Sequence, residues 1–442
     1  MTRYAEPSAV GGRVFAPASK SSMQRALACA AMASGTSNIT NPTWCADSIA
    51  AMGVARALGA TVERFDDRMI VRGGLFGSSA RTGPGGSSPN AIVASCGESG
   101  LCLRMFSAIA SLSPADVELR GEGSLSARPV GMVEGPLTAL GVRCATAGGF
   151  QPVRVRGPLR AGDVSVDGSE SSQFLTGLLL ALPMAGEGSG GRCDSVVKVR
   201  NLASHGYVDL TLDVMRAFGA RVDRDDAFTE FRIGGGRPYR AADYRVEGDW
   251  SGAAFLLVAG AIAATGEPLE VMGLDASSSQ PDRAIIDALG LSGARLEQLP
   301  GAWRVRSGHL RAFSFDATDC PDLFPPLVAL ASRCSGVTEL YGASRLGAKE
   351  SDRAAALSGE FEKLGLKVVV EGDLMTVRGS GGERGSPGKR LRGSAVSSHG
   401  DHRIAMAVAV AALAGSGPVA IEGTDCVAKS WPEFFEALAS IS

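Results

Sequence analysis

An internal repeat limits what this chain can fold into more than any other feature of its sequence. Five times, an amphipathic segment ends on Leu-Gly or Phe-Gly and is followed by two short strand-like stretches around a polar turn. The five pairs are Leu58-Gly59, Leu140-Gly141, Phe218-Gly219, Leu289-Gly290 and Leu364-Gly365. Because glycine is the usual left-handed residue after a helix, each pair predicts a helix end that leads into a hairpin. The pairs recur roughly every 70 to 80 residues, which is typical of repeated structural units.

A second set of segments falls between these pairs and is almost entirely small and apolar. Runs such as Ile404 to Val410 are too apolar for a surface helix and too long for an ordinary strand. We therefore predict buried helices, each capped by the Ser or Asp at its start. The starts lie near Ser21, Ser99, Ser171, Asp249, Asp322 and Asp401.

Together the two sets predict six modules of about 75 residues, each with a buried helix, an amphipathic helix and strands. A solenoid is the competing interpretation. In a solenoid each repeat is covered only by its neighbours, whereas two groups of three buried helices can each form a core under sheets. A chain of 442 residues is also expected to form two domains. We therefore predict an α/β fold of two similar three-module domains.

The two ends of the chain are expected to belong to the same domain. The sixth module lacks a hairpin after its last helix, near Phe434 to Leu438. Strand-like residues near the N-terminus, including Arg13-Val14-Phe15, could supply it, so the first residues are predicted to pack with the C-terminal half. The predicted domains are residues 19–246 and residues 1–18 plus 247–442.

Composition and charge exclude several classes of protein. A formal net charge of -2 gives no general reason to expect nucleic acid. The nine cysteines are scattered and never form C-x-x-C, which argues against a disulfide framework or a zinc site and favours the cytoplasm. No apolar run reaches the roughly 18 residues of a membrane span. No G-x-G-x-x-G motif follows a predicted strand, so a Rossmann cofactor is not expected.

Polar and cationic residues gather at the starts of the predicted helices. Lys20, Arg25 and Arg403 are the most informative, because a cation at the positive end of a helix loses stability unless an anion is present. Several such helix ends together could bind two phosphates. Each feature also has a plainer interpretation: the serines as caps, Lys349 to Arg353 as a solvated helix start with local ion pairs, and His402 as a structural residue.

These residues belong to a series of short motifs that runs along the whole chain. The motifs are Ser19-Lys20-Ser21 with Arg25, Ala127-Arg128-Pro129, Ser171-Ser172-Gln173-Phe174-Leu175, Ser204 with Tyr207, Lys349-Glu350-Ser351-Asp352-Arg353, Asp401-His402-Arg403 and Ala428-Lys429-Ser430. In this order they resemble the 5-enolpyruvylshikimate-3-phosphate synthases, which move the enolpyruvyl group of phosphoenolpyruvate onto shikimate 3-phosphate. The resemblance implies two domains, each of three βαβαββ modules around a central helical core (an inside-out α/β barrel). It also implies that the substrates bind in the cleft between the domains.

The resemblance assigns a role to each matching residue. Shikimate 3-phosphate would be held, mainly by the first domain, through Lys20, Ser21, Arg25, Ser171, Ser172, Gln173, Ser204, Tyr207, Asp322 and Lys349. Phosphoenolpyruvate would be surrounded by Lys20, Gly100, Arg128, Gln173, Arg353, Arg403 and Lys429. Asp322 would be the base and Glu350 the proton donor and later acceptor, with Lys20 and Lys429 neutralising charge. No metal, organic cofactor, nucleic acid or membrane is implied, and a monomer is expected.

Two positions depart from the family pattern. Many members have Asn-Ala-Gly-Thr where this chain has Glu98-Ser99-Gly100-Leu101, so no role is carried over to Glu98 or Leu101. Arg345 stands where the family often has Asn, and its role is left open. Because glyphosate competes with phosphoenolpyruvate in this family, one interpretation of the first departure predicts weaker inhibition by glyphosate. In the alternative interpretation, Glu98 faces solvent and Leu101 only fills the core, and the inhibition is unchanged.

Three other functions are weighed against this one. A UDP-N-acetylglucosamine enolpyruvyl transferase would have the same fold, but it typically carries a reactive Cys where this chain has Gly123. An RNA 3′-phosphate cyclase would be expected to show a basic surface, which the net charge does not favour. A phosphate-binding protein without catalysis would gain nothing from Asp322 and Glu350 in a cleft for anions.

Overall fold

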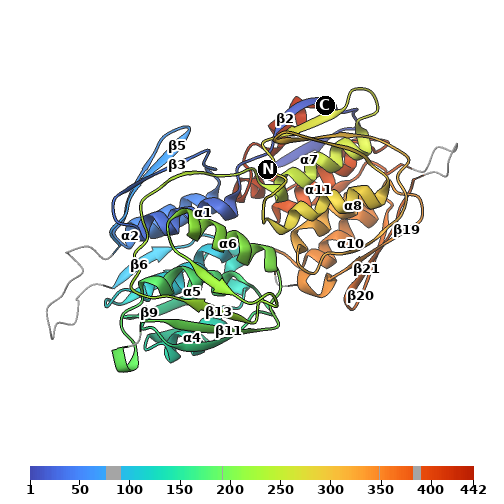
Figure 1. The fold of residues 1–442 in the computed structure, drawn as a ribbon. Coiled ribbons are helices and arrows are strands. Elements are labelled where there is room, and N and C mark those ends of the chain that lie inside the picture. Colours follow the sequence, from blue (N-terminus) through green and yellow to red (C-terminus); the bar gives the residue numbers. More distant parts are fainter. Residues whose placement is uncertain (76–90, 192, 348, 382–389) are drawn as a thin grey trace. The chain divides into compact units, whose positions relative to one another are not determined.

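The computed structural model describes residues 1–75, 91–191, 193–347, 349–381 and 390–442. Its contacts divide the chain into two compact units. The continuous unit comprises Ala18–Val246, and the split unit comprises Met1–Pro17 and Glu247–Ser442. The chain therefore passes between the units twice, and both termini lie in the split unit (Figure 1).

The sheets described in the continuous unit share one design. Two parallel strands lie on one side, and a hairpin adds two antiparallel strands on the other. In sheet order the strands are β14 (Asp243–Arg245), β3 (Thr36–Thr40), β5 (Arg68–Arg72) and β4 (Thr61–Arg64); β6 (Ile92–Ser95), β7 (Val117–Arg120), β9 (Phe150–Arg156) and β8 (Arg143–Ala147); and β10 (Asp163–Asp167), β11 (Ser195–Arg200), β13 (Glu230–Ile233) and β12 (Val222–Arg224). The hairpins predicted after Leu58-Gly59, Leu140-Gly141 and Phe218-Gly219 are confirmed.

The split unit repeats this design with one variation. Its strands, in sheet order, are β16 (Arg295–Leu299), β17 (Ala302–Arg306), β15 (Leu269–Met272) and β2 (Gly12–Phe15); β18 (Ser314–Asp316), β19 (Val337–Tyr341), β21 (Leu374–Arg378) and β20 (Lys367–Glu371); and β1 (Thr2–Ala5), β23 (Val419–Glu422) and β22 (Ala395–Ser397). In the last sheet the single strand β1 takes the place of the hairpin. Strands that are far apart in sequence thus lie side by side, which joins the two ends of the chain.

The N-terminal strands complete two sheets, where the sequence predicted one. The first residues do pair with strands of the C-terminal half. However, Arg13-Val14-Phe15 does not complete the last sheet: it lies in β2, parallel to β15. Thr2–Ala5 fills that place instead, antiparallel to β23. Both segments are compatible with a short strand, and only the tertiary pairing decides which sheet edge each one joins.

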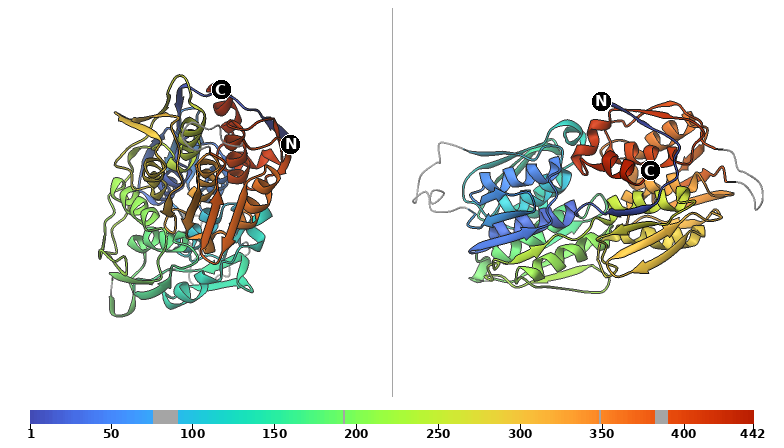
Figure 2. Two further views of the ribbon diagram at one scale, coloured as in Figure 1. Left: turned by 90° about the vertical axis from the view of Figure 1, so that its right-hand side faces the viewer. Right: turned by 90° about the horizontal axis from the view of Figure 1, so that it is seen from above.

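The predicted buried helices form the centres of the two units. In the split unit α7, α9 and α11 pack against one another, and in the continuous unit α3 packs on α5 while α1 packs against α2 and α6. The sheets of each unit lie outside these helices (Figure 2). The buried helices are α1 (Lys20–Met32), α3 (Gly100–Ala110), α5 (Gln173–Ala181), α7 (Trp250–Ala263), α9 (Phe324–Ala331) and α11 (His402–Ala412). The others are α2 (Ala46–Ala57), α4 (Glu134–Ala139), α6 (His205–Ala217), α8 (Ile285–Ser292), α10 (Arg353–Lys363) and α12 (Phe434–Ser440).

Four of the five predicted helix ends are confirmed. α2, α4, α6 and α10 end at the expected Leu or Phe, and the next glycine has a positive φ in each case. The prediction at Leu289-Gly290 was wrong, because α8 continues to Ser292 and ends before Gly293, whose φ is 83°. Gly290 can be helical, so the chain makes further helical hydrogen bonds before the next glycine stops it.

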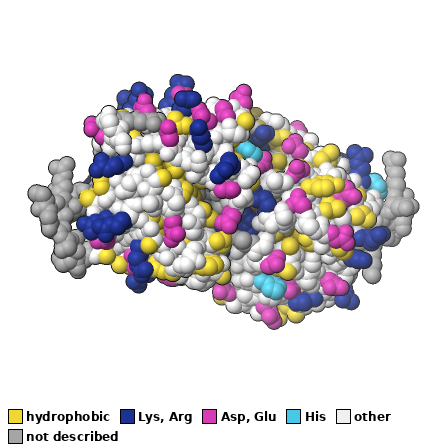
Figure 3. Space-filling view, turned by 90° about the horizontal axis from the view of Figure 1, so that it is seen from below, with side chains coloured by type: hydrophobic (Ala, Val, Ile, Leu, Met, Phe, Trp, Pro, Cys, Tyr) yellow, Lys and Arg dark blue, Asp and Glu magenta, His cyan; other side chains and the backbone are white. Residues whose placement is uncertain are grey.

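The described surface carries charge of both signs. On the face drawn in Figure 3, Lys and Arg side chains are interspersed with Asp and Glu side chains. In the part of the chain that the structure describes, no helix combines the length and the apolar character that crossing a membrane requires.

Candidate active site

The start of α1 places a cation at the positive end of a buried helix. Ser19 caps this helix by accepting a hydrogen bond from the Ser22 N–H at 3.3 Å. Lys20 is the first helical residue, and its Nζ lies 2.9 Å from Oδ2 of Asp47 in α2. Asp47 therefore offsets the repulsion between Lys20 and the helix dipole.

Arg25 is buried one turn further along α1. It donates hydrogen bonds to the carbonyls of Ser21 at 2.8 Å and Tyr207 at 3.3 Å. It also donates to the hydroxyls of Thr211 at 2.8 Å and Thr176 at 3.4 Å, so it joins α1 to α5 and α6. Burial lowers the pKa of Arg25 to about 10. Among the described residues no carboxylate pairs with this guanidinium, and a buried cation held only by neutral groups favours an anion in a ligand.

The first turns of α5 and α6 carry the other predicted hydroxyl and amide groups of this unit. The Ser171 hydroxyl accepts a hydrogen bond from the Gln173 N–H at 3.1 Å, and Ser172 is the buried N-cap residue of α5. Ser204 is the buried N-cap residue of α6, with a φ of 63°. That left-handed conformation is uncommon for serine.

Two arginines converge on Gly100 at the start of α3. A Cβ atom built on Gly100 would lie 2.9 Å from one terminal nitrogen of Arg104 and 2.9 Å from both terminal nitrogens of Arg128. Both side chains are buried, and Arg104 also donates to Oε1 of Gln173 at 2.8 Å. Two guanidinium groups at a helix N-terminus, with backbone N–H groups beside them, are suited to bind a phosphate or a carboxylate. Any side chain at Gly100 would occupy that space.

Arg353 is the centre of a buried cluster of charges in the split unit. Its side chain is 1% exposed. Its NH1 lies 2.6 Å from Oδ1 of Asp322 and its NH2 lies 2.5 Å from Oε2 of Glu350. Its Nε lies 2.8 Å from Oδ2 of Asp401. Arg403 binds the second carboxylate oxygen of Asp322 at 2.9 Å, so the structure brings four of the predicted site residues together.

The cations of this cluster hold Asp322 in its ionised form. Burial alone would raise its pKa, but Arg403, Arg353 and Lys349 together lower it well below the usual range. Burial also lowers the pKa of Lys349 to about 8, an effect that Asp322 partly offsets. A carboxylate with a low pKa is a weak base. Asp322 therefore becomes a better base only when another anion engages its arginine partners.

Two predicted cations, Arg403 and Lys429, and Arg345, whose role was left open, lie in elements around this cluster. Arg403 is in the first turn of α11, and its N–H donates to the N-cap residue Asp401 at 2.9 Å. Lys429 is a buried residue at the end of the 3-10 helix η9 (Thr424–Lys429), which packs against α11. Arg345 donates to the Thr318 carbonyl at 2.6 Å, and burial lowers the pKa of Arg345.

The sequence analysis assigned no site role to two residues of these clusters. Arg104 follows Gly100 by four residues in an otherwise apolar helix, and a cation in such a run was the available signal. Asp401 matched the cap pattern, but its carboxylate also binds Arg353, which no local pattern indicates. In the described parts of the chain, no group of three His, Cys, Asp or Glu residues could hold a metal ion.

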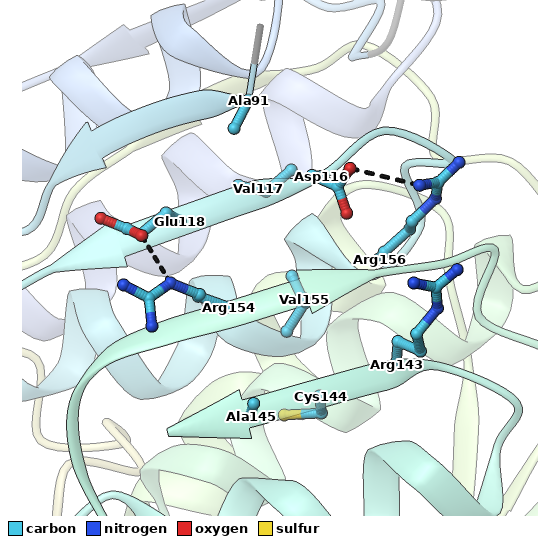
Figure 4. Close-up of a pocket in the computed structure, with 10 residues that line it drawn as sticks. All are labelled: Ala91, Asp116, Val117, Glu118, Arg143, Cys144, Ala145, Arg154, Val155 and Arg156. Atoms are coloured by element: carbon cyan, nitrogen blue, oxygen red, sulfur yellow. Dashed lines mark hydrogen bonds and ion pairs between the residues drawn. The ribbon is translucent and has the colours of Figure 1, made fainter. Parts of the chain in front are cut away.

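A cavity on the outer face of the β6-β7-β9-β8 sheet does not belong to the candidate site. It has a volume of about 370 Å³ and none of the predicted residues lines it (Figure 4). Glu118 and Arg154 pair across the strands at 2.6 Å, and Asp116 and Arg156 pair at 3.2 Å. Its acidic side chains are therefore already neutralised by its own arginines.

Comparisons with known proteins cover the whole chain. The family model of EPSP synthase (3-phosphoshikimate 1-carboxyvinyltransferase) matches residues 4–438. A 3-phosphoshikimate 1-carboxyvinyltransferase of Clostridium kluyveri is 36% identical over 438 residues, which are 98% of this chain and 96% of that protein. One of Aeropyrum pernix is 37% identical over 436 residues, which are 98% of this chain and 94% of that protein.

Solved structures with the same fold also span both units. An EPSP synthase from Acinetobacter baumannii superimposes with a TM-score of 0.82 at 26% identity, covering 100% of this chain and 98% of that one. The enolpyruvyl transferase NikO from Streptomyces tendae has a TM-score of 0.75 at 19% identity, covering 99% and 97%. The predicted α/β architecture of two similar units is therefore confirmed.

Proposed function

The chain belongs to the EPSP synthase family, and we propose that its buried arginines bind the two anionic substrates of the family reaction. In that reaction the enolpyruvyl group of phosphoenolpyruvate moves to the 5-hydroxyl of shikimate 3-phosphate, releasing phosphate. The alternative acceptor, UDP-N-acetylglucosamine, is not favoured, because the family model and the relatives all concern the shikimate enzyme. The buried cations at the helix starts are the observation that supports this assignment of residues.

In this proposal, shikimate 3-phosphate binds to the continuous unit near Arg25. Arg25 meets only neutral partners there, so the phosphate would supply its missing counterion. The hydroxyls at the starts of α5 and α6 suit the hydroxylated ring. By the family resemblance, the binding set would also include Lys349 and Asp322 of the split unit.

Phosphoenolpyruvate would engage the two arginine clusters. Arg104 and Arg128 at Gly100 offer one anion site in the continuous unit. Arg353 and Arg403 offer another in the split unit, but there Asp322 and Glu350 occupy the guanidinium groups. The substrate anion would compete with these carboxylates for the arginines.

This competition would prepare the two carboxylates for proton transfer. Once phosphoenolpyruvate engages the arginines, Asp322 loses the charges that lower its pKa and becomes a stronger base. Asp322 then takes the proton of the 5-hydroxyl while the oxygen attacks C2 of phosphoenolpyruvate. Once released from Arg353, Glu350 acts in its protonated form and gives that proton to the methylene carbon C3, and the tetrahedral adduct forms.

When the tetrahedral adduct breaks down, Glu350 acts as a base instead of an acid. Glu350 takes a proton back from the methyl group, the C2–O bond to phosphate breaks, and the enol ether forms. The proton that Asp322 took from the 5-hydroxyl passes to the departing phosphate, so both carboxyl groups return to the forms in which they began. Lys20 and Lys429 neutralise the charge on the departing phosphate. Every step uses groups of the chain and the substrates alone.

The proposal includes a monomer in the cytoplasm. All nine cysteines are free in the structure, and six of them are buried, as expected of a protein in a reducing compartment. Sedimentation of the purified protein and fractionation of its source cells would test these two points.

A phosphate-release assay tests the function directly. With phosphoenolpyruvate as donor, shikimate 3-phosphate should support turnover and UDP-N-acetylglucosamine should not. The assignment of Arg25 is tested by R25Q, which should raise the KM for shikimate 3-phosphate by at least about tenfold, the scale of one charge-assisted contact. R216Q is the control, because Arg216 lies exposed on α6 and pairs with Asp213. Turnover with the nucleotide sugar instead would refute the proposed function.

A further inference from the structure

We propose that Glu98 is a positioning residue that sets Arg128 against Gly100, and so controls the affinity for phosphoenolpyruvate. The inference rests on the proposed role of Arg128. It concerns a position where the chain departs from the pattern of its family, and where that pattern therefore suggests no role. The argument comes from the contacts that Glu98 makes across two segments of the continuous unit.

Glu98 connects the start of α3 to the segment that carries Arg128. The two segments run side by side: the Cys96 N–H donates to the Arg120 carbonyl at 2.7 Å and the Glu122 N–H donates to the Gly97 carbonyl at 2.8 Å. At the end of this ladder, Oε2 of Glu98 accepts hydrogen bonds from the Ser124 N–H at 2.9 Å and the Ser124 hydroxyl at 2.7 Å. A charged acceptor with two donors makes this a strong contact.

The contact with Glu98 caps a short helix to which Glu98 itself does not belong. Ser124 lies in the first turn of the 3-10 helix η2 (Gly123–Ala127), where N–H groups have no partner within the helix. The N-cap residue Glu122 makes no side-chain capping bond, since its carboxylate accepts from the Ser95 hydroxyl at 2.7 Å instead. Glu98 supplies the missing acceptor, and its negative charge suits a helix N-terminus.

Arg128 follows directly at the other end of η2. Its N–H donates to the Leu125 carbonyl at 3.2 Å, and Leu125 is anchored in the core with 1% of its surface exposed. η2 is only five residues long, so fixing its first turn fixes the backbone of Arg128. The Arg128 guanidinium lies 2.9 Å from the position that a Cβ atom of Gly100 would take, so a shift of η2 would move this group relative to the start of α3.

Gly123 offers a second way to test this contact. A Cβ atom at Gly123 would lie 2.5 Å from Cδ of Glu98 and 2.6 and 2.9 Å from its two oxygens. The carboxylate is the flexible end of a side chain, so an alanine at this position would push it away from Ser124. G123A should therefore remove the contact while Glu98 itself stays unchanged.

The charge of Glu98 can be separated from its position. A glutamine at this site can accept from the Ser124 N–H through its oxygen and donate to the Ser124 hydroxyl through its amide. E98Q therefore keeps both contacts without the negative charge, whereas E98A loses both. If E98Q binds phosphoenolpyruvate as the parent does, Glu98 acts through the hydrogen bonds that hold η2 in place, and its charge is not required.

The experiment measures KM for each substrate, and kcat, in E98A, E98Q, G123A and E98A/G123A. E98A and G123A should each raise the KM for phosphoenolpyruvate by about tenfold, the scale of losing one or two charged hydrogen bonds. Values of kcat and of the KM for shikimate 3-phosphate should change by less than about threefold, which is under 1 kcal/mol. The double variant should be no worse than either single variant, because both changes remove the same contact. E98Q should recover most of the lost affinity.

Matched variants keep the result interpretable. G148A controls for the strain of alanine at a positive φ, because Gly148 has a φ of 64° and nothing within 4 Å of its Cβ position. S124A removes one of the two hydrogen bonds and should give a smaller rise in the same KM, even if E98A does not fold. R128A separates the two proposals: an unchanged KM for phosphoenolpyruvate in R128A refutes the role of Arg128. A raised KM in R128A but not in E98A and G123A overturns the inference about Glu98, as do additive effects in the double variant.

Discussion

Replacing Asp322 by asparagine should weaken the folded protein and catalysis while strengthening the binding of phosphoenolpyruvate. Asp322 neutralises Arg353 through one oxygen and Arg403 through the other. D322N keeps the shape of the side chain but removes its charge. The cluster then holds more positive than negative charge, and only an added anion can restore the balance.

The size of the effect follows from the burial of the partners. Removing one partner of a buried ion pair typically costs roughly 3 to 5 kcal/mol. Arg353 is 1% exposed but Asp322 is 22% exposed, so water can partly replace the lost carboxylate. We expect a loss of about 2 to 3 kcal/mol, or roughly 4 to 6 °C in melting temperature at about 2 °C per kcal/mol.

Two further measurements separate the roles of Asp322. Phosphoenolpyruvate should raise the melting temperature of D322N more than that of the parent, because the arginines no longer have to release a carboxylate. Turnover should fall by about two to four orders of magnitude, the scale of removing a catalytic base. D287N is the control, since Asp287 is an exposed acid in the first turn of α8 in the same unit.

The lowered pKa of Asp322 sets the pH range of the effect. The pKa of an aspartate in an unfolded chain is about 3.9, and the pKa of Asp322 in the folded protein lies below that value. The stabilisation by Asp322 is therefore complete above about pH 4 and is lost as the pH falls through the folded pKa. The difference in melting temperature between parent and D322N should be constant from neutral pH to about pH 5 and should shrink below about pH 4. Weaker binding of phosphoenolpyruvate by D322N, or near-normal turnover, would refute this reasoning.

E350Q should lower kcat by about two to four orders of magnitude with an unchanged circular dichroism spectrum, and near-normal turnover would remove Glu350 from the mechanism. Burial lowers the pKa of Lys349 to about 8, so the KM for shikimate 3-phosphate should rise above about pH 8 as the ammonium loses its charge. K349R should abolish that rise, and a persistent rise would assign it to another group. R104K should raise the KM for phosphoenolpyruvate by about tenfold, because the lysine ammonium lacks the planar set of donors with which a guanidinium binds Gln173 and an anion at once. An equal KM in R104K and the parent would show that Arg104 is only structural. Restoring the family residues in E98N/L101T should lower the ratio of the glyphosate inhibition constant to the KM for phosphoenolpyruvate, and an equal ratio would refute the predicted tolerance.

Helix type and burial could be predicted from local patterns. The apolar run after Asp249 is uniform over α7, and every residue of that helix is buried. Such a segment is stable only inside a core, so its sequence already implies its environment. The caps at Ser99, Asp249 and Asp401 were predicted correctly, because capping needs only neighbouring residues. The prediction was wrong for α9, whose N-cap residue is Leu323 instead of Asp322, and no side-chain cap bond forms at α5.

The pairing partners of the strands and the end of one helix could not be predicted from local patterns. β1 and β2 are both four residues long, and each satisfies the pattern of a short strand. Which edge each joins depends on which unpaired backbone groups the rest of the fold presents. Leu289-Gly290 looked like a helix end, but the residues that follow continue α8 to Ser292.

The sequence by itself determined the repeat, the buried helices, the family and the residue types of the candidate site. The tertiary structure decided which of these residues meet, because contacts between charged groups depend on distances that the chain spans only when folded. Arg353 lies 48 residues from Asp401 and 31 from Asp322, yet it binds both carboxylates. The contact between Glu98 and Ser124 likewise spans 26 residues. Local sequence patterns reach only a few residues along the chain, whereas charge balance in a buried site is decided by whatever the fold brings within hydrogen-bonding distance.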